Sequence, residues 1–200
     1  MRGMTWIISV LMGLLSACAS APPPVKHHDL LVATPAQAPS SASSGVSIGM
    51  GNVSVPPYLL ALPLVHRQGN RLLMSETNQW TQSLGETVPL TVKAGLAARL
   101  PTAVFLSAPF DKAAFPVWRV FVRIDRLEAV DNHAVELDAR WSIIDRHGKT
   151  VLTQKAALQA PIADGSALDA DMTDVVTAHR EVLSQLCARL AEDLGQLPAP

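Results

Sequence analysis

The residue with the clearest chemical role is Cys18, which ends the sequence Leu15-Ser16-Ala17-Cys18. It follows a positive start, Met1-Arg2, and a mostly apolar run from residue 6 to residue 15. The run is shorter than the roughly 20 residues of a stable membrane-spanning helix and has the layout of a secretory signal. Small residues directly before such a cysteine are typical of a bacterial lipobox. The cysteine sulfur then receives a diacylglyceryl group, and cleavage frees the amine for another acyl chain.

Two or more acyl chains anchor a protein firmly, because each buried CH₂ contributes about 0.8 kcal/mol. The sequence therefore predicts that residues 1–17 are a cleaved signal peptide and that Cys18 is the lipidation site. The folded part would then face the bacterial periplasm. The alternative is an ordinary secretory signal in which this cysteine stands by chance.

No other group of residues is expected to form a reaction centre. The stretch Gly45-Val46-Ser47-Ile48-Gly49 has the Gly-x-Ser-x-Gly spacing, but no helix follows it at once, and Cys187 lies in a helical pattern that predicts a small buried hydrophobe. The sequence His27-His28-Asp29 could bind a metal, but no further Cys or His is spaced for zinc, so a solvated pair is favoured. Residues 169–174 resemble a calcium loop without its glycine and final glutamate, which favours a helix cap. We therefore expect no enzyme activity, no metal and no cofactor.

Three phenylalanines, Phe105, Phe110 and Phe115, flank a loop that contains Pro109 and Pro116. If the loop is exposed, these rings form an apolar patch for a protein partner. Packing in the core is the alternative. Trp80 and Trp141 are expected to be core anchors.

Composition bounds the remaining function classes. The formal net charge is −1 and no basic run is present, which argues against nucleic-acid binding. Residues 18–44 combine the acylated cysteine with an Ala, Pro and Ser-rich stretch, which predicts an extended tether. The apolar patch at residues 28–32 is the exception and could dock as an edge strand. Residues 45–197 are predicted to form a single domain.

The hydrophobic patterns within this domain predict strands, a helix, strands and a final helix. A four-residue repeat from Trp80 to Leu100 predicts a helix that begins near Thr77 or Asn78 and is kinked or divided at Pro89. A second helix is predicted over residues 171–194, with Asp171, Thr173 and Asp174 as cap-type residues. Strands are predicted at residues 45–55, 62–65, 71–75, 103–106, 117–130, 134–145 and 150–158, the last three as an antiparallel meander.

Two amphipathic helices with one apolar stripe each can cover one face of a sheet. We therefore expect an α/β (α+β) fold, a two-layer sandwich whose mostly antiparallel or mixed sheet is covered on one face by the two helices. The other face of the sheet is expected to be wetter.

Several of these pieces together resemble a known family. They are the lipobox, the Asp29-Leu30-Leu31 motif, the Pro57-Tyr58-Leu59 motif and the spacing Asn70-x-Leu72-x-x-x-Glu76-x-x-x-Trp80-x-x-x-Leu84. Further along stand Leu127-Glu128 and Leu137-x-Ala139-x-Trp141-x-Ile143-Ile144-Asp145-x-x-Gly148, before a C-terminal helix rich in Ala and Leu. This chain is similar to the paraquat-inducible protein C (PqiC, YmbA-like) family of ABC-type transport auxiliary lipoproteins. It departs from that family in lacking a tyrosine near His28-Asp29 and in having Leu60-Ala61 where polar residues often follow.

The resemblance implies a non-catalytic subunit of an intermembrane lipid transport system whose partner is a mammalian-cell-entry (MCE) type protein. It also implies attachment to the membrane through the lipid and allows a ring of identical copies. Ala19 after the acylated cysteine fits sorting to the outer membrane, by the rule known from enteric bacteria. A structural lipoprotein of outer-membrane biogenesis, and an enzyme with a dispersed site, are the alternative functions.

Overall fold

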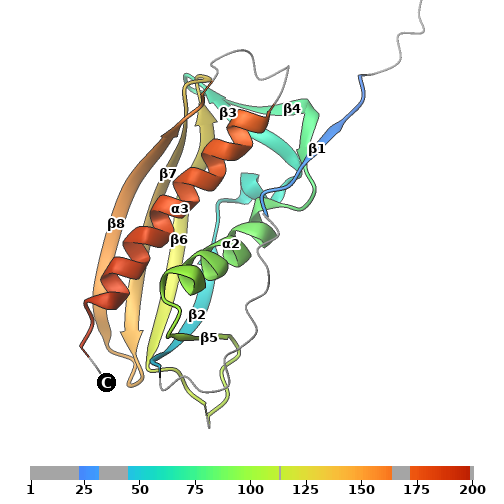
Figure 1. Cartoon of the computed structure of the whole chain (residues 1–200). Helices are drawn as coiled ribbons and strands as arrows, with labels where there is room; N and C mark the ends of the chain where they lie inside the picture. The colour runs from blue at the N-terminus through green and yellow to red at the C-terminus, as the bar shows by residue number, and fades with distance from the viewer. Residues whose placement is uncertain (1–22, 32–44, 113, 164–171, 199–200) are drawn as a thin grey trace, which may run out of the picture.

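A computed structural model describes residues 23–31, 45–112, 114–163 and 172–198. Cys18 and the predicted signal peptide lie outside these residues. The described chain forms an eight-stranded mixed sheet with two long helices on one of its faces (Figure 1). The elements are β1 (Lys26–His28), β2 (Ser47–Ser54), η2 (Pro57–Leu60), β3 (Pro63–Gln68), β4 (Arg71–Trp80), α2 (Leu84–Arg99), β5 (Val104–Ser107), β6 (Trp118–Val130), β7 (Ala134–Asp145), β8 (Thr150–Pro161) and α3 (Thr173–Gly195). The predicted two-layer α+β fold is confirmed.

Strand β6 is the centre of the sheet. On one edge it pairs antiparallel with β7, which pairs antiparallel with β8, so the predicted meander is confirmed. Its other edge is shared: β2 runs parallel to its first half and β3 is parallel to its last residues. The β6–β7 turn places Asp131 and Asn132 at positive φ with a hydrogen bond from His133 N to Val130 O, the geometry of a type I′ hairpin turn.

A β-bulge keeps one face of β6 apolar along its whole length. Ile124 pairs with Ala139 and Arg126 pairs with Asp138, so Asp125 is an extra residue on β6. The bulge reverses which residues point toward the helices, and the apolar set continues across it. The buried members are Trp118, Val120, Val122 and Ile124 before the bulge, and Leu127 and Ala129 after it.

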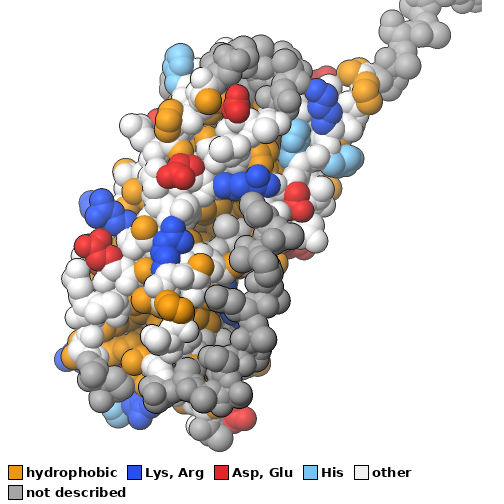
Figure 2. Space-filling model, in the orientation of Figure 1, with side chains coloured by type: hydrophobic (Ala, Val, Ile, Leu, Met, Phe, Trp, Pro, Cys, Tyr) orange, Lys and Arg blue, Asp and Glu red, His pale blue; other side chains and the backbone are white. Residues whose placement is uncertain are grey.

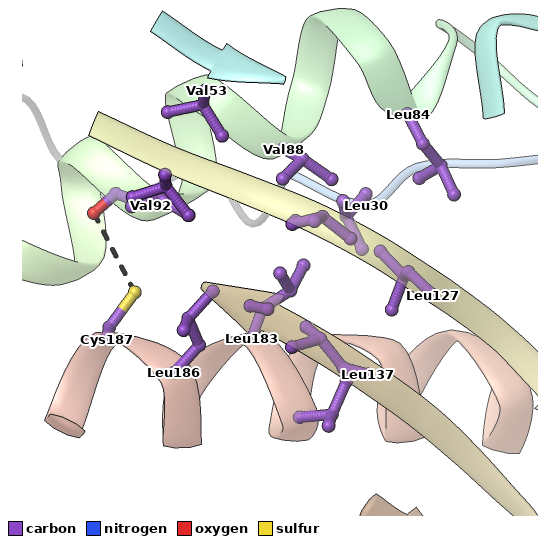
Figure 3. Close-up of a cluster of buried hydrophobic side chains, with 14 of the residues drawn as sticks. Leu30, Val53, Leu84, Val88, Val92, Leu127, Leu137, Leu183, Leu186 and Cys187 are labelled. Carbon is purple, nitrogen blue, oxygen red and sulfur yellow. Dashed lines mark hydrogen bonds between the residues drawn. The ribbon is translucent and has the colours of Figure 1, made fainter. Parts of the chain in front are cut away.

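The two helices close the core over this face. Leu84, Val88, Val92 and Leu96 of α2 are buried, as the four-residue repeat predicted. Figure 3 shows how side chains from both helices, from β6 and β7, and Leu30 from the segment after β1 meet in one cluster. The predicted burial of Cys187 is confirmed: its thiol is 1% exposed and its Sγ lies 3.7 Å from the Val92 carbonyl oxygen.

The helices approach closely at one glycine. A Cβ placed on Gly95 of α2 would lie 2.5 Å from the Sγ of Cys187 in α3. Such a contact is shorter than real Cβ atoms make, so this close approach requires glycine. Pro89 lies inside α2, which is continuous over Leu84–Arg99, and the prediction that the helix divides there is wrong.

The predicted start of the first helix near Thr77 or Asn78 is also wrong. These residues belong to β4, where both backbone N–H groups are near the Ser75 hydroxyl oxygen, at 3.4 and 3.0 Å. Trp80 N donates to Leu62 O, which extends the strand to Trp80, and α2 begins only after Ser83. Of the cap-type residues expected for the last helix, Thr173 and Asp174 lie inside its first turn, because the N-cap position is Met172, and Asp174 supplies the expected negative charge there. Asp171 lies outside the described residues.

The first strand lies inside the segment expected to be a tether. β1 pairs parallel with β4, and Leu30 just after it is 2% exposed. Arg180 of α3 holds this segment through hydrogen bonds from Nε to Leu30 O and from Nη2 to Asp29 O. The edge strand predicted for this region is therefore present, two residues earlier than the apolar patch suggested.

Candidate functional site

The open face of the sheet, which neither helix covers, carries an aromatic surface at one end. Phe110 and Phe115, in the connection between β5 and β6, pack edge to face with ring centroids 5.9 Å apart. The Arg119 guanidinium lies over the Phe115 ring, 5.1 Å from its centroid. Phe115 is 36% exposed. We call Phe110, Phe115, Pro116 and Arg119 the Phe corner.

Gly49 of β2 seats the Phe corner on the sheet, and Gly51 seats the neighbouring Phe121. A Cβ on Gly49 would lie within 2.8 Å of both Phe110 and Pro116, and one on Gly51 would lie 2.6 Å from the Phe121 ring. The absence of side chains at these positions lets the Phe110 and Phe121 rings rest directly on the β2 backbone. The loop is therefore held against the open face by packing.

Phe105 does not belong to this surface. It pairs in parallel register with Ile48, a core residue, and therefore shares the helix-covered side of the sheet with it. It packs against the core, half-buried. The sequence grouped three phenylalanines, whereas the structure brings together Phe110 and Phe115 and separates Phe105. The alternation of side chains along β5 could have distinguished them, but only together with the pairing of β2 and β5. That pairing places Phe105 opposite Ile48, and therefore on the same side of the sheet as this core residue.

Beyond the Phe corner, the open face carries a ladder of ion pairs between β6 and β7. Asp125, exposed by the bulge, accepts hydrogen bonds from Arg123 at 2.9 Å and from Arg140 at 2.8 Å. The bond from Arg140, followed by that from Arg123, holds the pKa of Asp125 below its usual range. Arg126 pairs with both Glu136 and Asp138 across the strands. A shallow groove of about 830 Å³ over β7 and β8 borders this ladder, with Asp125, Asp138, Arg140 and Lys155 among its lining residues.

A buried polar cluster ends the ladder and joins two of the motifs singled out in the sequence. Glu128 of β6 is fully buried and forms an ion pair with Arg67 of β3. The hydroxyl of Tyr58, from η2, lies 3.4 Å from the Leu127 N–H, and burial raises the pKa of this hydroxyl, with the neighbouring Glu128 adding to the effect. The cluster ties η2, β3 and β6 together, so the Tyr58 and Glu128 motifs have a structural role.

The histidines considered as metal ligands serve the first strand. The His28 ring nitrogen Nε2 lies 3.0 Å from Asn78 Oδ1, and Asp29 Oδ1 accepts a hydrogen bond from Leu31 N. Within the described ranges, no three His, Cys, Asp or Glu side chains are grouped so that they could hold a metal ion. In the same part of the chain, no helix combines the length and apolar character needed to cross a bilayer.

Trp80 and Trp141 are core residues, as predicted. Trp80 packs edge to face with His179, centroids 5.2 Å apart, and Trp141 donates a 2.7 Å hydrogen bond from Nε1 to Asp193 Oδ2. His179 is fully buried, and burial lowers the pKa of its ring to about 4. Its Nδ1 lies 2.8 Å from Val175 O, so a buried histidine that the sequence placed on a helix face is neutral and structural.

An α+β fold with a closed core and one open, aromatic and charged sheet face has the features of a binding module. The family model for the ABC-type transport auxiliary lipoprotein component matches residues 28–191. The chain belongs to this family, the PqiC/YmbA-like family that its motifs resemble. The family is described as an auxiliary component of transport, and its lipoprotein character implies a membrane-anchored location facing the periplasm.

Solved structures share the fold. A crystal structure of an uncharacterized protein aligns with a TM-score of 0.69 at 17% identity, covering 86% of this chain and 99% of that one. Protein XCC0632 from Xanthomonas campestris, of the DUF330 family, aligns with a TM-score of 0.62 at 11% identity, covering 82% and 92%. A weaker similarity, with a TM-score of 0.41 at 9% identity over 71% and 86% of the chains, is to the PelC dodecamer from Paraburkholderia phytofirmans. No curated protein matches the sequence.

Proposed function

We propose that this protein is a non-catalytic docking subunit of an MCE and ABC-type intermembrane phospholipid transport system, anchored through acylated Cys18 to the periplasmic face of the outer membrane. Residues 1–17 are its signal peptide and residues 18–44 link the anchor to the domain. In this role it positions an MCE-domain partner at the membrane and contributes to membrane integrity. The palmitate-type chain on the cysteine amine completes the anchor.

The observation that carries this proposal is the Phe corner on the open face. The Phe110 ring and Pro116 rest on Gly49, the Arg119 guanidinium lies over the Phe115 ring, and Phe115 remains more than one third exposed. Aromatic rings and arginine are the side chains that dominate the energetics of protein interfaces. The adjoining ladder of ion pairs supplies a polar border of both signs, which suits a protein partner better than an anionic polymer.

The helix-covered side of the protein is a weaker candidate for the partner surface. Figure 2 shows apolar, basic and acidic side chains interspersed over it, without a region of one charge. We therefore assign partner contact to the open face, with Phe110 and Phe115 as the contact residues and Phe105 left in the core.

The test is site-specific crosslinking in the native host. A photoreactive amino acid at Phe115 is expected to crosslink to an MCE-domain protein, identified by mass spectrometry, while the same group at Leu90 on α2 is not. Leu90 is a matched control because it is an exposed apolar residue, 51% accessible, on the helix side. Crosslinking to an outer-membrane assembly protein instead, or equal crosslinking from both positions, would overturn the proposal in favour of a biogenesis role.

The proposal also predicts the consequence of removing the rings. The double substitution Phe110→Ser and Phe115→Ser should leave the fold intact and sensitise cells to detergent as strongly as deletion of the gene does. A ring of copies is part of the proposal, and the mass of the lipidated protein in detergent, measured by sedimentation, decides between a monomer and an assembly.

A further inference from the structure

We propose that the end of the domain formed by Val25, Leu72 and Met74 lies on the phospholipid surface of the membrane that holds the anchor. The contact is apolar and fixes the orientation of the domain, so that the Phe corner points away from that membrane. The inference rests on the proposed function in one respect, the acylation of Cys18.

The length of chain between the anchor and the sheet supports this contact. Lys26 begins β1 and stands eight residues after Cys18. Because a fully extended chain spans at most about 3.3–3.6 Å per residue, these residues bridge no more than about 29 Å. Strand β6 alone has 13 residues and, at about 3.3 Å each, is roughly 43 Å long. The link is therefore shorter than the domain and keeps one end of it at the membrane.

The topology determines which end this is. β1 pairs with the final residues of β4, with Lys26 opposite Asn78, and β4 starts at the β3–β4 hairpin turn. Figure 1 shows that β1 begins at the same end of the molecule as the β3–β4 hairpin and runs away from it, while the β5–β6 connection that carries the Phe corner lies at the opposite end. A membrane anchor attached at β1 therefore faces the hairpin.

The hairpin end carries unusual side chains for a surface exposed to water. Val25 is 42% exposed, Leu72 is 37% exposed and Met74 is 54% exposed. Leu72 and Met74 are alternate residues of β4, so they point to the same side of the strand. Isolated apolar residues are common on surfaces, but here three lie at the end of the domain that the anchor holds beside lipid.

The charges around these residues are of both signs, which defines the chemistry of the contact. Arg71 and Asp131 are exposed at the tips of the two hairpins at this end, and Glu76 follows Met74 on β4. Lys26, directly after Val25, is a second exposed cation, but Glu76 and Asp131 balance the two cations, whereas attraction to anionic lipid requires a basic cluster. The contact is therefore apolar insertion into a zwitterionic surface and depends little on salt. The anchor makes it an intramolecular step, so weak insertion suffices.

The experiment uses the full-length chain, expressed with its signal and purified as the lipidated protein, with the acyl mass on Cys18 verified first. Single cysteines replace Met74 at the hairpin end or Val151 at the start of β8, and each carries an environment-sensitive fluorophore. Val151 is the matched control, since it is 39% exposed and is the second residue of the strand that follows the β7–β8 turn. Burial raises the pKa of the Cys187 thiol to about 11, so this cysteine does not compete for the label.

In phosphatidylcholine vesicles, the probe at position 74 should shift to shorter wavelength and be quenched by doxyl-labelled lipid, at low and high salt alike. The probe at position 151 should do neither. A further substitution, Leu72→Glu, should reduce quenching at 74 while the protein stays bound through its lipid.

Equal quenching at 74 and 151, or none at either position in protein that carries the acyl groups, overturns the inference and leaves the docking role standing. Absence of acyl groups on Cys18 in native material instead removes the proposed function itself, so the two failures are distinguishable.

Discussion

The two faces of the sheet differ in the type of side chain that they carry and in how far these side chains are buried. On the helix-covered face, the apolar residues of β6 and β7 are almost fully buried: Val120, Leu137 and Ile143 are each 0% exposed. On the open face of the same strands, the side chain of Arg123 is 67% exposed and that of Arg140 is 61% exposed. One face holds the fold together through burial of apolar surface, whereas the other presents charge and aromatic rings to whatever binds there.

The difference separates stability from recognition within single strands. Because side chains alternate along a strand, one residue in two of β6 and β7 can change for binding without touching the core. The bulge at Asp125 preserves this division where the alternation would otherwise fail. Substitutions on the two faces should therefore have effects of different size and kind.

The largest effect is expected from truncation on the helix-covered face. Leu186 of α3 is fully buried in the core cluster, so Leu186→Ala removes apolar contacts and leaves a cavity. We expect a loss of about 3–5 kcal/mol in the free energy of unfolding, measured by urea denaturation. The matched substitution Leu72→Ala, on an exposed residue, should cost less than about 0.5 kcal/mol. Similar losses for the two would contradict the division between the faces.

The next effect lies on the open face itself, where the ion pairs differ in burial. Arg67→Ala would leave Glu128, which is fully buried, without its positive partner. Removing one member of a buried pair costs about 3–5 kcal/mol, and the lower end is expected because Arg67 keeps part of its side chain in water. Arg123→Ala breaks a pair with an exposed arginine and should cost at most about 1 kcal/mol. If the urea midpoint falls equally in the two variants, the burial of an ion pair on this face does not determine how much the pair contributes to stability.

This division explains how much of the molecule its sequence could predict. The long strands β6, β7 and β8 and both helices follow from periodicity, because half-buried elements of this length carry a strong pattern. β1 is three residues long and pairs with a partner about 50 positions away, so no local pattern indicates its pairing. The same limit separated Phe105 from Phe110, since the face of a short strand is set by its pairing.

The start of the first helix could not be predicted for a related reason. Trp80 fits the four-residue repeat of α2, but tertiary contacts hold it in β4, where its N–H bonds to Leu62 O. Asn78, which has the chemistry of a helix cap, is instead a buried neighbour of His28. Local propensity was overridden by pairing between distant strands.

A third prediction concerns how acid changes the stability of the protein through one buried core residue, His179. The folded protein keeps His179 neutral down to a pKa of about 4, whereas the unfolded chain protonates this ring near 6.5. Between these values the unfolded state binds the extra proton, so the free energy of unfolding falls as pH drops, by roughly 3 kcal/mol in full. Urea unfolding from pH 7 to pH 4 measures this slope.

The variant His179→Phe retains an aromatic ring against Trp80 and should flatten the profile in that window. Asp125 and Asp145 cannot cause a loss of stability between pH 7 and pH 4. Their pKa values are lowered in the folded protein, so the stability that they contribute is lost only at still lower pH. An unchanged slope in the variant would assign the acid sensitivity to another group.

The smallest effect tests whether residues on the helix-covered face act together. In Gly95→Ala, the new methyl group meets Cys187 Sγ, and overpacking of about 1–3 kcal/mol is partly offset by about 1 kcal/mol of helix propensity. Cys187→Ala removes the sulfur, so the double variant should be more stable than the sum of the two single effects by about 1 kcal/mol. On the open face, Arg123→Ala and Met74→Ala lie in separate elements and should add to within about 0.5 kcal/mol. If the effects add in both pairs, Gly95 and Cys187 are not energetically coupled. The two helices would then shift to relieve the contact, in spite of the burial of both residues.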